Sequence, residues 1–534
     1  MKAESSALRD FTVDRRVWLL SAVALIIGIG ATFLAVLLLK LIAVSTNLFY
    51  YHRLSAATVS PAGSPLGYWM VIVPVVGGLL VGWMARYGSD KIRGHGIPEA
   101  IEAILLNRAR VDPKVAILKP ISAAIAIGSG GPFGAEGPII MSGGALGSLI
   151  AQWIKLTDAE RTTLLVAGAA AGMSATFATP VAAILLAVEL LLFELRPRSL
   201  VPVAIASATA AILRGYLLSP GPLFHVPAIS GVDRIPIAAG CLLLGALMGL
   251  VAAAMSRMMY AFEDGFERLP LHWMWWPALG GVGIGIGGLI FPHGLGVGYD
   301  NIATLLTGNA PVALILGIIL VKSVMWAFSL GSGTSGGVLA PLLMIGGAVG
   351  ALAAHLAHAT TDMQAFWALI GMGAMLAGSL GVPMTAILFS LEVTHCLPAL
   401  LPLTMGCIAS YLVTALLMPR SILTEKLSRR GYHLTREYGV DPLEIVIIKD
   451  LMSPLSENPP DGEKLPDLFV YADGTCRSAA ELMATEALAS LPVVDRKTGG
   501  ISGTITLQDL LKGRSKAVTR ENERLSLITR SNHR

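Results

Sequence analysis

Long apolar runs are the feature that most limits what this chain can fold into. The run from Val17 to Ala43 exceeds the length of about 20 residues that crosses a bilayer. It is also too long for the apolar part of a secretory signal peptide. Further apolar runs follow it as far as residue 418, and glycine and proline interrupt several of them. The sequence therefore predicts an all-α, multi-pass membrane protein.

The charged residues are distributed unevenly, and this divides the chain. Only 14% of all residues are charged, against about 25% in soluble domains. Residues 420–534 nevertheless hold 33 of the 74 charged side chains. We expect a short N-terminus (1–16), a membrane domain (17–430), a small folded tail domain (446–517) and a disordered end (518–534).

Basic residues indicate which ends of the spans face the cytoplasm. Arg15 and Arg16 precede the first span, and the connection 86–114 is rich in lysine and arginine. The positive-inside bias places these segments in the cytoplasm of a cell membrane, together with the tail. The net charge of +4 is scattered, so no nucleic-acid partner is expected. The four cysteines fit no metal or disulfide spacing, and no nucleophile motif predicts an enzyme.

An internal repeat is the strongest structural signal. GPIIMSGGALGSLIA (137–151) resembles APLLMIGGAVGALAA (340–354), and PVAAILLAVE (180–189) resembles PMTAILFSLE (383–392), both at an offset of 203 residues. One ungapped register over about 55 residues is difficult to obtain by chance. Two repeats with a site at their interface are typical of transporters. The pattern alone does not say whether the repeats are inverted.

Three glycine-rich segments each contain a proline at a predicted helix start. They are GHGIPEA (94–100), GPFGAEGP (131–138) and GSGTSGGVLAP (331–341). A helix start presents unpaired N–H groups and the positive end of the helix dipole. Several such starts would bind an anion weakly enough to release it. The alternative is that these glycines only allow close helix packing, but three segments of the same kind favour an anion site.

Glu136 lies at the second of these helix starts, within an apolar region. An acidic residue inside a membrane domain is a functional candidate by default. Its carboxylate could cap the helix, or compete with a permeating anion and so act as a gate that protonation opens.

The three segments resemble the GSGIP, GxEGP and GxFxP signature of the CLC family, which contains voltage-gated chloride channels and chloride–proton antiporters. The resemblance runs over about residues 15–430. It implies an inverted repeat of broken and tilted helices, a homodimer with one chloride pathway per subunit, and a gating role for Glu136. It also implies structural roles for four charged residues: Lys119, Glu189, Lys322 and Glu392. The lysines would neutralise a carboxylate or a group of carbonyls, and the glutamates would cap a neighbouring segment.

The chain departs from the family pattern at the central anion site. His95 stands in place of a serine, Leu339 in place of a phenylalanine, and Leu423 in place of a tyrosine. The remaining candidate ligands are backbone N–H groups of Gly96, Ile97, Gly337, Val338 and Leu339. The imidazole of His95 either joins the site or points into the cytoplasmic vestibule.

The resemblance also predicts where proton coupling would require a second acid. That position directly follows Glu189 and is Leu190 here. Glu194, four residues further on, would lie near the same face of a continuing helix, although Arg196 is its expected partner. These losses favour a passive chloride channel, with a proton-coupled antiporter as the alternative. A regulatory membrane protein with a degenerate pore is a more distant one.

The tail resembles a single cystathionine-β-synthase (CBS) motif, a small α/β unit that ends in GTITLQD (503–509). The resemblance makes Thr506 and Asp509 candidate contacts for an adenine nucleotide. Such motifs work in pairs, and one per chain favours a folded cap that pairs across the dimer. We expect no metal and no other cofactor.

Overall fold

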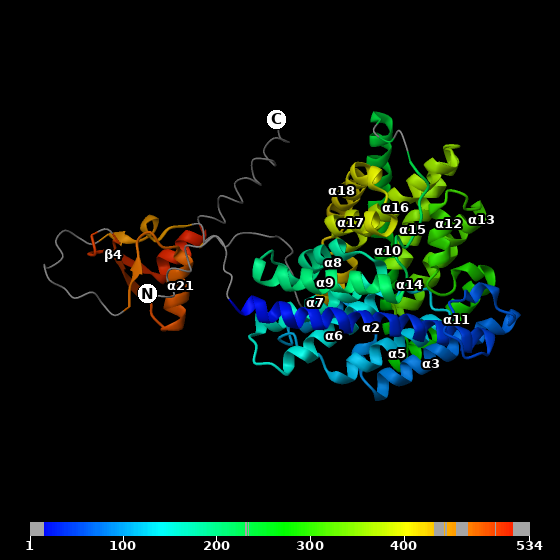
Figure 1. Ribbon diagram of the computed structural model, residues 1–534, viewed down its shortest axis with the longest axis horizontal. Helices are drawn as coiled ribbons and strands as arrows, with labels where there is room; N and C mark the ends of the chain where they lie inside the picture. Colours follow the sequence, from blue (N-terminus) through cyan, green and yellow to red (C-terminus); the bar gives the residue numbers. More distant parts are fainter. Residues whose placement is uncertain are drawn as a thin grey trace. The chain divides into compact units, whose positions relative to one another are not determined.

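The computed structural model describes residues 15–229, 232, 234–431, 443, 446–454, 468–496 and 498–515. The chain divides into two compact units. The larger unit is Asp14–Arg436, and the smaller is formed by Met1–Val13 and Glu437–Arg534. Figure 1 shows the larger unit as an assembly of helices and the smaller one as a unit that contains a sheet.

Within the described residues, nine helices are long and apolar enough to cross a membrane. They are Arg16–Tyr51, Gly67–Tyr87, Pro197–Leu217, Ile235–Glu267, Trp273–Ile290, Val312–Gly331, Leu339–Leu356, Thr361–Leu380 and Leu397–Arg429. Shorter apolar helices cover Pro180–Leu192 and Pro383–Thr394. The expected all-α, multi-pass membrane domain is therefore confirmed.

The repeat extends much further than the sequence motifs suggest. Six helices of the first half have an equivalent about 203 residues later. The pairs are α3 (Ile72–Tyr87) with α11 (Trp276–Ile290), α4 (Ile97–Leu105) with α12 (Tyr299–Leu306), α6 (Glu136–Gln152) with α15 (Leu339–Leu356), α7 (Asp158–Phe177) with α16 (Thr361–Leu380), α8 (Pro180–Leu186) with α17 (Pro383–Thr394), and α9 (Pro197–Leu217) with α18 (Leu400–Leu417). The first half also contains α2 (Arg16–Tyr51) and α5 (Pro113–Gly128), and the second contains α10 (Ile235–Glu267), α13 (Val312–Leu316) and α14 (Ser323–Gly331).

Two sets of hydrogen bonds show that the halves are related by an approximate two-fold axis. Gly134 and its equivalent Gly337 form an antiparallel bridge, in which each N–H donates to the carbonyl of the other at 3.3 and 2.9 Å. Glu189 accepts hydrogen bonds from N–H groups at the start of α17, and its equivalent Glu392 accepts them at the start of α8. Reciprocal contacts of this kind require a two-fold relation.

Glycines bring the helices of each half into close contact. A Cβ atom on Gly143 of α6 would lie 2.3 Å from the carbonyl oxygen of Gly168 in α7. At the equivalent place, a Cβ on Gly346 of α15 would lie 2.4 Å from the oxygen of Gly371 in α16. Larger residues would separate these helices, so the packing interpretation of glycine holds at these positions.

The smaller unit is an α/β fold with its own core. Its sheet has the strand order β1 (Ser453–Pro454), β4 (Ile501–Thr506), β3 (Ser490–Val494) and β2 (Val470–Tyr471). Strands β2 and β3 are parallel, and the other neighbours are antiparallel. Helix α21 (Cys476–Thr485) connects β2 to β3, and a further helix covers residues 507–515.

Candidate anion site

Backbone hydrogen bonds bring the three glycine-rich segments together. The N–H of Gly94 donates to the carbonyl of Thr334 at 3.0 Å, and the N–H of Gly336 donates back to Gly94 at 3.4 Å. The Gly134–Gly337 bridge joins the segment 131–138 to the segment 331–341. The starts of α4, α6 and α15 therefore converge, as the sequence predicts.

The carboxylate of Glu136 lies at this convergence and is fully buried. Its Oε1 accepts a long hydrogen bond of 3.4 Å from the hydroxyl of Tyr299, at the start of α12. Its Oε2 has no hydrogen-bond donor within the part of the chain that the structure describes. A buried carboxylate oxygen without a donor is costly, so this oxygen indicates a functional rather than a structural position.

Glycine is required beside this carboxylate. A Cβ atom on Gly134 would lie 1.7 Å from Oε2 of Glu136, and one on Gly337 would lie 2.7 Å from it. A Cβ on Gly137 would lie 1.7 Å from the carbonyl oxygen of His95. The segments leave room for the carboxylate only because these positions lack side chains.

Two of the expected backbone ligands are already engaged. The N–H of Gly96 donates to Oε2 of Glu99 at 2.7 Å, and the N–H of Gly337 donates to the carbonyl of Gly134. The assignment of these two amides to an anion is therefore revised. Ile97 and Leu339 are the first residues of α4 and α15, and the N–H groups of a first helical turn have no intrahelical acceptor. The N–H groups of Ile97, Leu339 and Val338 are therefore the better candidates for anion ligands.

Glu99 is a residue that the sequence interpretation missed. It is the third residue of α4, and its side chain reaches back to accept a hydrogen bond from the N–H of Gly96, the residue before the helix. Its other oxygen accepts a 2.8 Å hydrogen bond from Lys426 Nζ of α19 (Ile422–Arg429). Proline at the second helical position followed directly by glutamate is a recognisable helix-start signal that could have identified it.

His95 and Leu423 are both buried beside the start of α4. His95 is 3% exposed, and its Nδ1 has no hydrogen-bond partner among the described residues. Leu423 is fully buried on α19, three residues before Lys426. The burial of His95 argues against the alternative in which its ring points into an open vestibule.

Lys119 and Lys322 are equivalent residues, and both are fully buried. Lys119 Nζ donates to the carbonyls of Ile92 and Gly94, each at 2.8 Å. Lys322 Nζ donates to the carbonyls of Gly296 and Val297 at 3.1 and 3.5 Å. Each lysine thus holds the segment that leads into α4 or α12, so the carbonyl interpretation fits their contacts.

The membrane unit matches a known family. The family model described as "Voltage gated chloride channel" matches residues 77–415. The chain belongs to this family, the CLC proteins.

Individual relatives agree with this assignment. The chain is 32% identical to chloride channel protein CLC-f of Arabidopsis thaliana over 64% of its own length. That alignment spans about half the length of the plant protein, 46%. This chain is also 30% identical to the H(+)/Cl(-) exchange transporter ClcA of Salmonella arizonae, over 66% of this chain and 76% of that protein.

Solved structures show the same fold. A slow cyanobacterial Cl-/H+ antiporter superposes with a TM-score of 0.67 and 23% identity, over 78% of this chain and 99% of the other. A eukaryotic CLC transporter superposes with a TM-score of 0.65 and 18% identity, over 92% of this chain and 98% of the other. The CLC inverted-repeat fold is therefore confirmed. The family match ends at residue 415, so the CBS resemblance of the tail stays a prediction.

The CLC position expected to carry the second acid is filled by an apolar side chain. Leu190 is fully buried. The idea that Glu194 continues the same helix face is wrong, because the helical segment ends at Leu192 and Phe193 adopts a left-handed conformation with φ 52°. Glu194 instead forms ion pairs with Arg196 at 3.4 Å and with Arg198 at 3.5 Å.

Thr506 and Asp509, the candidate nucleotide contacts in the tail, bind each other. The hydroxyl and the N–H of Thr506 donate to Oδ2 of Asp509 at 2.7 and 3.1 Å. The N–H of Asp509 donates back to the Thr506 hydroxyl at 3.2 Å. The Thr506 side chain lowers the pKa of Asp509. This arrangement caps helix 507–515.

Proposed function

We propose that this chain is a proton-coupled antiporter that exchanges chloride, or a similar small anion, for protons across a cell membrane. One observation carries the proposal. Three helix starts meet around the buried carboxylate of Glu136, and Oε2 of that carboxylate has no donor within the described residues.

Convergent helix starts suit an anion that must also leave. The N–H groups of Ile97, Val338 and Leu339 offer partial positive charge without a full cation. Binding by partial charges is moderate, which permits rapid release. Lys119 does not compete for the anion, because its amine is bonded to the Ile92 and Gly94 carbonyls.

Glu136 would supply the gate. Its ionised carboxylate carries the same charge as chloride and lies beside the same helix starts, so it competes with the anion for them. Protonation removes the charge, and the side chain can then leave the position to an anion. Transport of a proton by the same group would couple the two fluxes.

The comparisons favour antiport over the passive channel that the sequence favoured. A relative aligned over 76% of its length is named an H(+)/Cl(-) exchange transporter, and a solved structure with the same fold is a Cl-/H+ antiporter. The presence of Leu190 indicates uncoupled anion flow only if no other group takes the place of the missing acid. A degenerate pore is disfavoured, because Glu136 and all three helix starts are in place.

We assign the internal proton position to His95. Glu194 is engaged by two arginines and by the hydroxyl of Ser199. His95 is buried beside α4 and its Nδ1 has no partner in the described part of the chain. The imidazole ring has a nitrogen that can accept and release a proton, which a leucine side chain cannot do.

The assembly is proposed by family analogy to be a homodimer, with the tail on the cytoplasmic side. The tail would serve as a folded cap that pairs across the dimer, because Thr506 and Asp509 bind each other and leave the nucleotide role without support. Removal of residues 446–534 tests this: the assembly should weaken or the activity change modestly, while the membrane dimer persists in size-exclusion chromatography with light scattering. Monomers would show that the tail holds the dimer.

The deciding experiment measures the reversal potential of the protein in liposomes under separate chloride and pH gradients. Antiport predicts a potential that shifts with both gradients, together with uphill proton movement driven by chloride. A potential that follows chloride alone would restore the channel interpretation. His95→Phe should abolish the proton shift, and His293→Phe, which changes a histidine after α11, serves as the control.

A further inference from the structure

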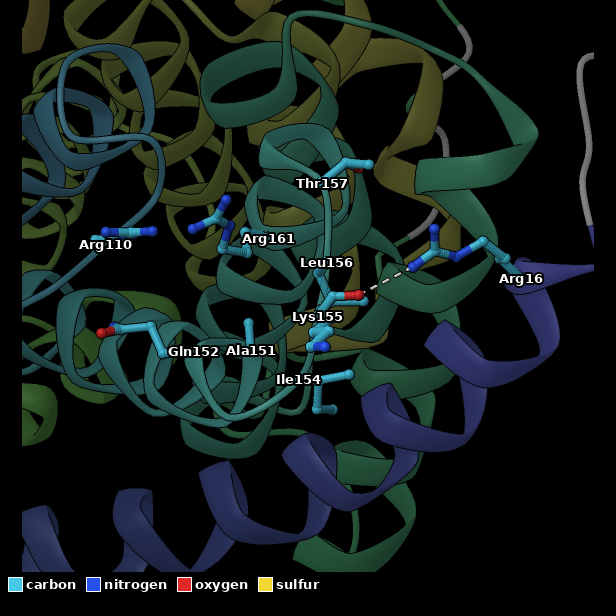
Figure 2. A pocket seen from close by; sticks show the side chains of 9 residues that line it. All are labelled: Arg16, Arg110, Ala151, Gln152, Ile154, Lys155, Leu156, Thr157 and Arg161. Atoms are coloured by element: carbon cyan, nitrogen blue, oxygen red, sulfur yellow. Dashed lines mark hydrogen bonds between the residues drawn. The ribbon is translucent and has the colours of Figure 1, made fainter.

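A basic hollow lies at one end of the membrane unit, apart from the anion site. Its volume is about 610 Å³, which corresponds to roughly 20 water molecules. It forms where α2 begins, α6 ends and α7 begins, and Figure 2 shows its side chains. Four of the described residues that line it are cations, namely Arg16, Arg110, Lys155 and Arg161, and none is acidic.

Nearby carboxylates neutralise only part of this charge. Arg16 pairs with Glu160 at 2.9 Å, and its Nη2 donates to the carbonyl of Lys155 at 3.1 Å, as Figure 2 shows. Arg161 pairs with Asp158.

Two further cations have no such partner. Arg110 and Lys155 form no ion pair within the described part of the chain. In addition, Nε of Arg161 is buried and finds no acceptor there. The hollow therefore has surplus positive charge and an unused guanidinium donor, which are the features that a phosphate group requires.

Two exposed tryptophans indicate the depth of the hollow in the membrane. Trp18 follows Arg16 by two residues and is 81% exposed, and Trp153 precedes Lys155 by two residues and is 85% exposed. Exposed tryptophans gather at the boundary between acyl chains and headgroups. The hollow therefore lies at headgroup level, and its basic character indicates the cytoplasmic leaflet, where anionic lipids attract lysine and arginine.

We propose that this hollow binds a phosphate group, carried either by the headgroup of an anionic lipid or by a soluble phosphate anion. The lipid is favoured because the tryptophans flank the hollow. Bound headgroup would join α2 to the α6–α7 connection, which come from distant parts of the sequence.

The test uses the full chain in nanodiscs and the double variant Arg110→Gln/Lys155→Gln. Both side chains are exposed, so the variant should fold. The control is Arg86→Gln/Lys114→Gln, which removes two exposed charges from the same basic connection, outside the hollow. One arm uses phosphatidylcholine doped with phosphatidylglycerol and counts retained lipid by native mass spectrometry. The other arm titrates inorganic phosphate into phosphatidylcholine nanodiscs.

We expect the double variant to retain anionic lipid about tenfold more weakly than the wild type, while the control retains it normally. Phosphate binding of the wild type in the neutral nanodisc, lost in the variant, would support the site and assign it to a soluble anion. Absence of both effects, or equal loss in the control, would overturn the proposal.

Discussion

The two halves of the membrane unit have the same scaffold but different residues at the site. Lys119 and Lys322 are repeat equivalents with similar contacts, and so are Glu189 and Glu392. Glu136, in contrast, is equivalent to Leu339. The repeat therefore supplies the inverted framework, whereas the pathway depends on residues that occur in one half only.

The first prediction tests this asymmetry and has the largest expected effect. Glu136→Gln should abolish chloride-driven proton pumping and remove the dependence of anion flux on external pH, because a neutral amide neither carries a proton nor repels an anion. Flux assays in liposomes at several pH values measure both. Glu267→Gln, which alters an exposed carboxylate at the end of α10, is the control. If the Glu136→Gln protein keeps the wild-type pH profile, Glu136 is not the gate.

A second prediction compares the buried lysines. Lys119→Met should lower the free energy of unfolding by about 2 kcal/mol, because two buried carbonyls lose a donor, although the removal of a buried charge offsets part of the loss. Lys322→Met should cost about 1 kcal/mol, since its bonds of 3.1 and 3.5 Å are longer than the 2.8 Å bonds of Lys119. Unfolding in detergent measures both. A larger loss at Lys322 would contradict the ranking.

The third prediction concerns the capping glutamates. Glu189 accepts a bond from the Thr385 hydroxyl at 2.6 Å in addition to two N–H groups, whereas the residue equivalent to Thr385 is Ala182. Glu189→Gln should therefore destabilise the unit by about 1 kcal/mol more than Glu392→Gln.

The substitution Thr385→Ala provides the matched background for that comparison. It removes the extra hydroxyl and makes the two capping sites alike. In this background the two glutamine variants should have equal thermal unfolding midpoints. A difference that persists would assign the asymmetry to something other than the hydroxyl.

The sequence predicted the features that stand out within apolar runs, Glu136 among them, and missed several that depend on contacts in the folded chain. The offset of 203 residues, the three helix starts and the charged residues of the membrane unit could be predicted because a glycine cluster followed by proline, and a charge, stand out within apolar runs. The role of Glu99 was missed although its capping signal was present. Glu194 is excluded from the helix because Phe193 has a left-handed backbone conformation. This conformation is uncommon for phenylalanine, so the sequence does not predict it.

Tyr299 was not predicted because nothing in its repeat marks it. Its equivalent is Gly96, and only the folded chain brings its hydroxyl to Glu136. Three aromatic rings support its position: Phe177 and Phe224 each lie 6.2 Å from the Tyr299 ring, and Phe389 packs on Phe177 at 5.3 Å. The second half therefore contributes to the gate through a residue that the first half lacks.

The last prediction measures how much that contribution matters, and its expected effect is the smallest. Tyr299→Phe keeps the ring and removes one hydrogen bond to Glu136, whose length of 3.4 Å indicates a stabilisation below about 1 kcal/mol. Anion flux at neutral pH should change by less than about fivefold, with the pH profile displaced toward easier protonation of Glu136, because the ionised carboxylate loses a donor. Tyr50→Phe, which removes a buried 3.0 Å hydrogen bond to Ser129, is the control and should leave the profile unchanged. Equal profiles for the two variants would show that Glu136 gates without help from the Tyr299 hydroxyl, and the second half would then contribute to the site only through the start of α15.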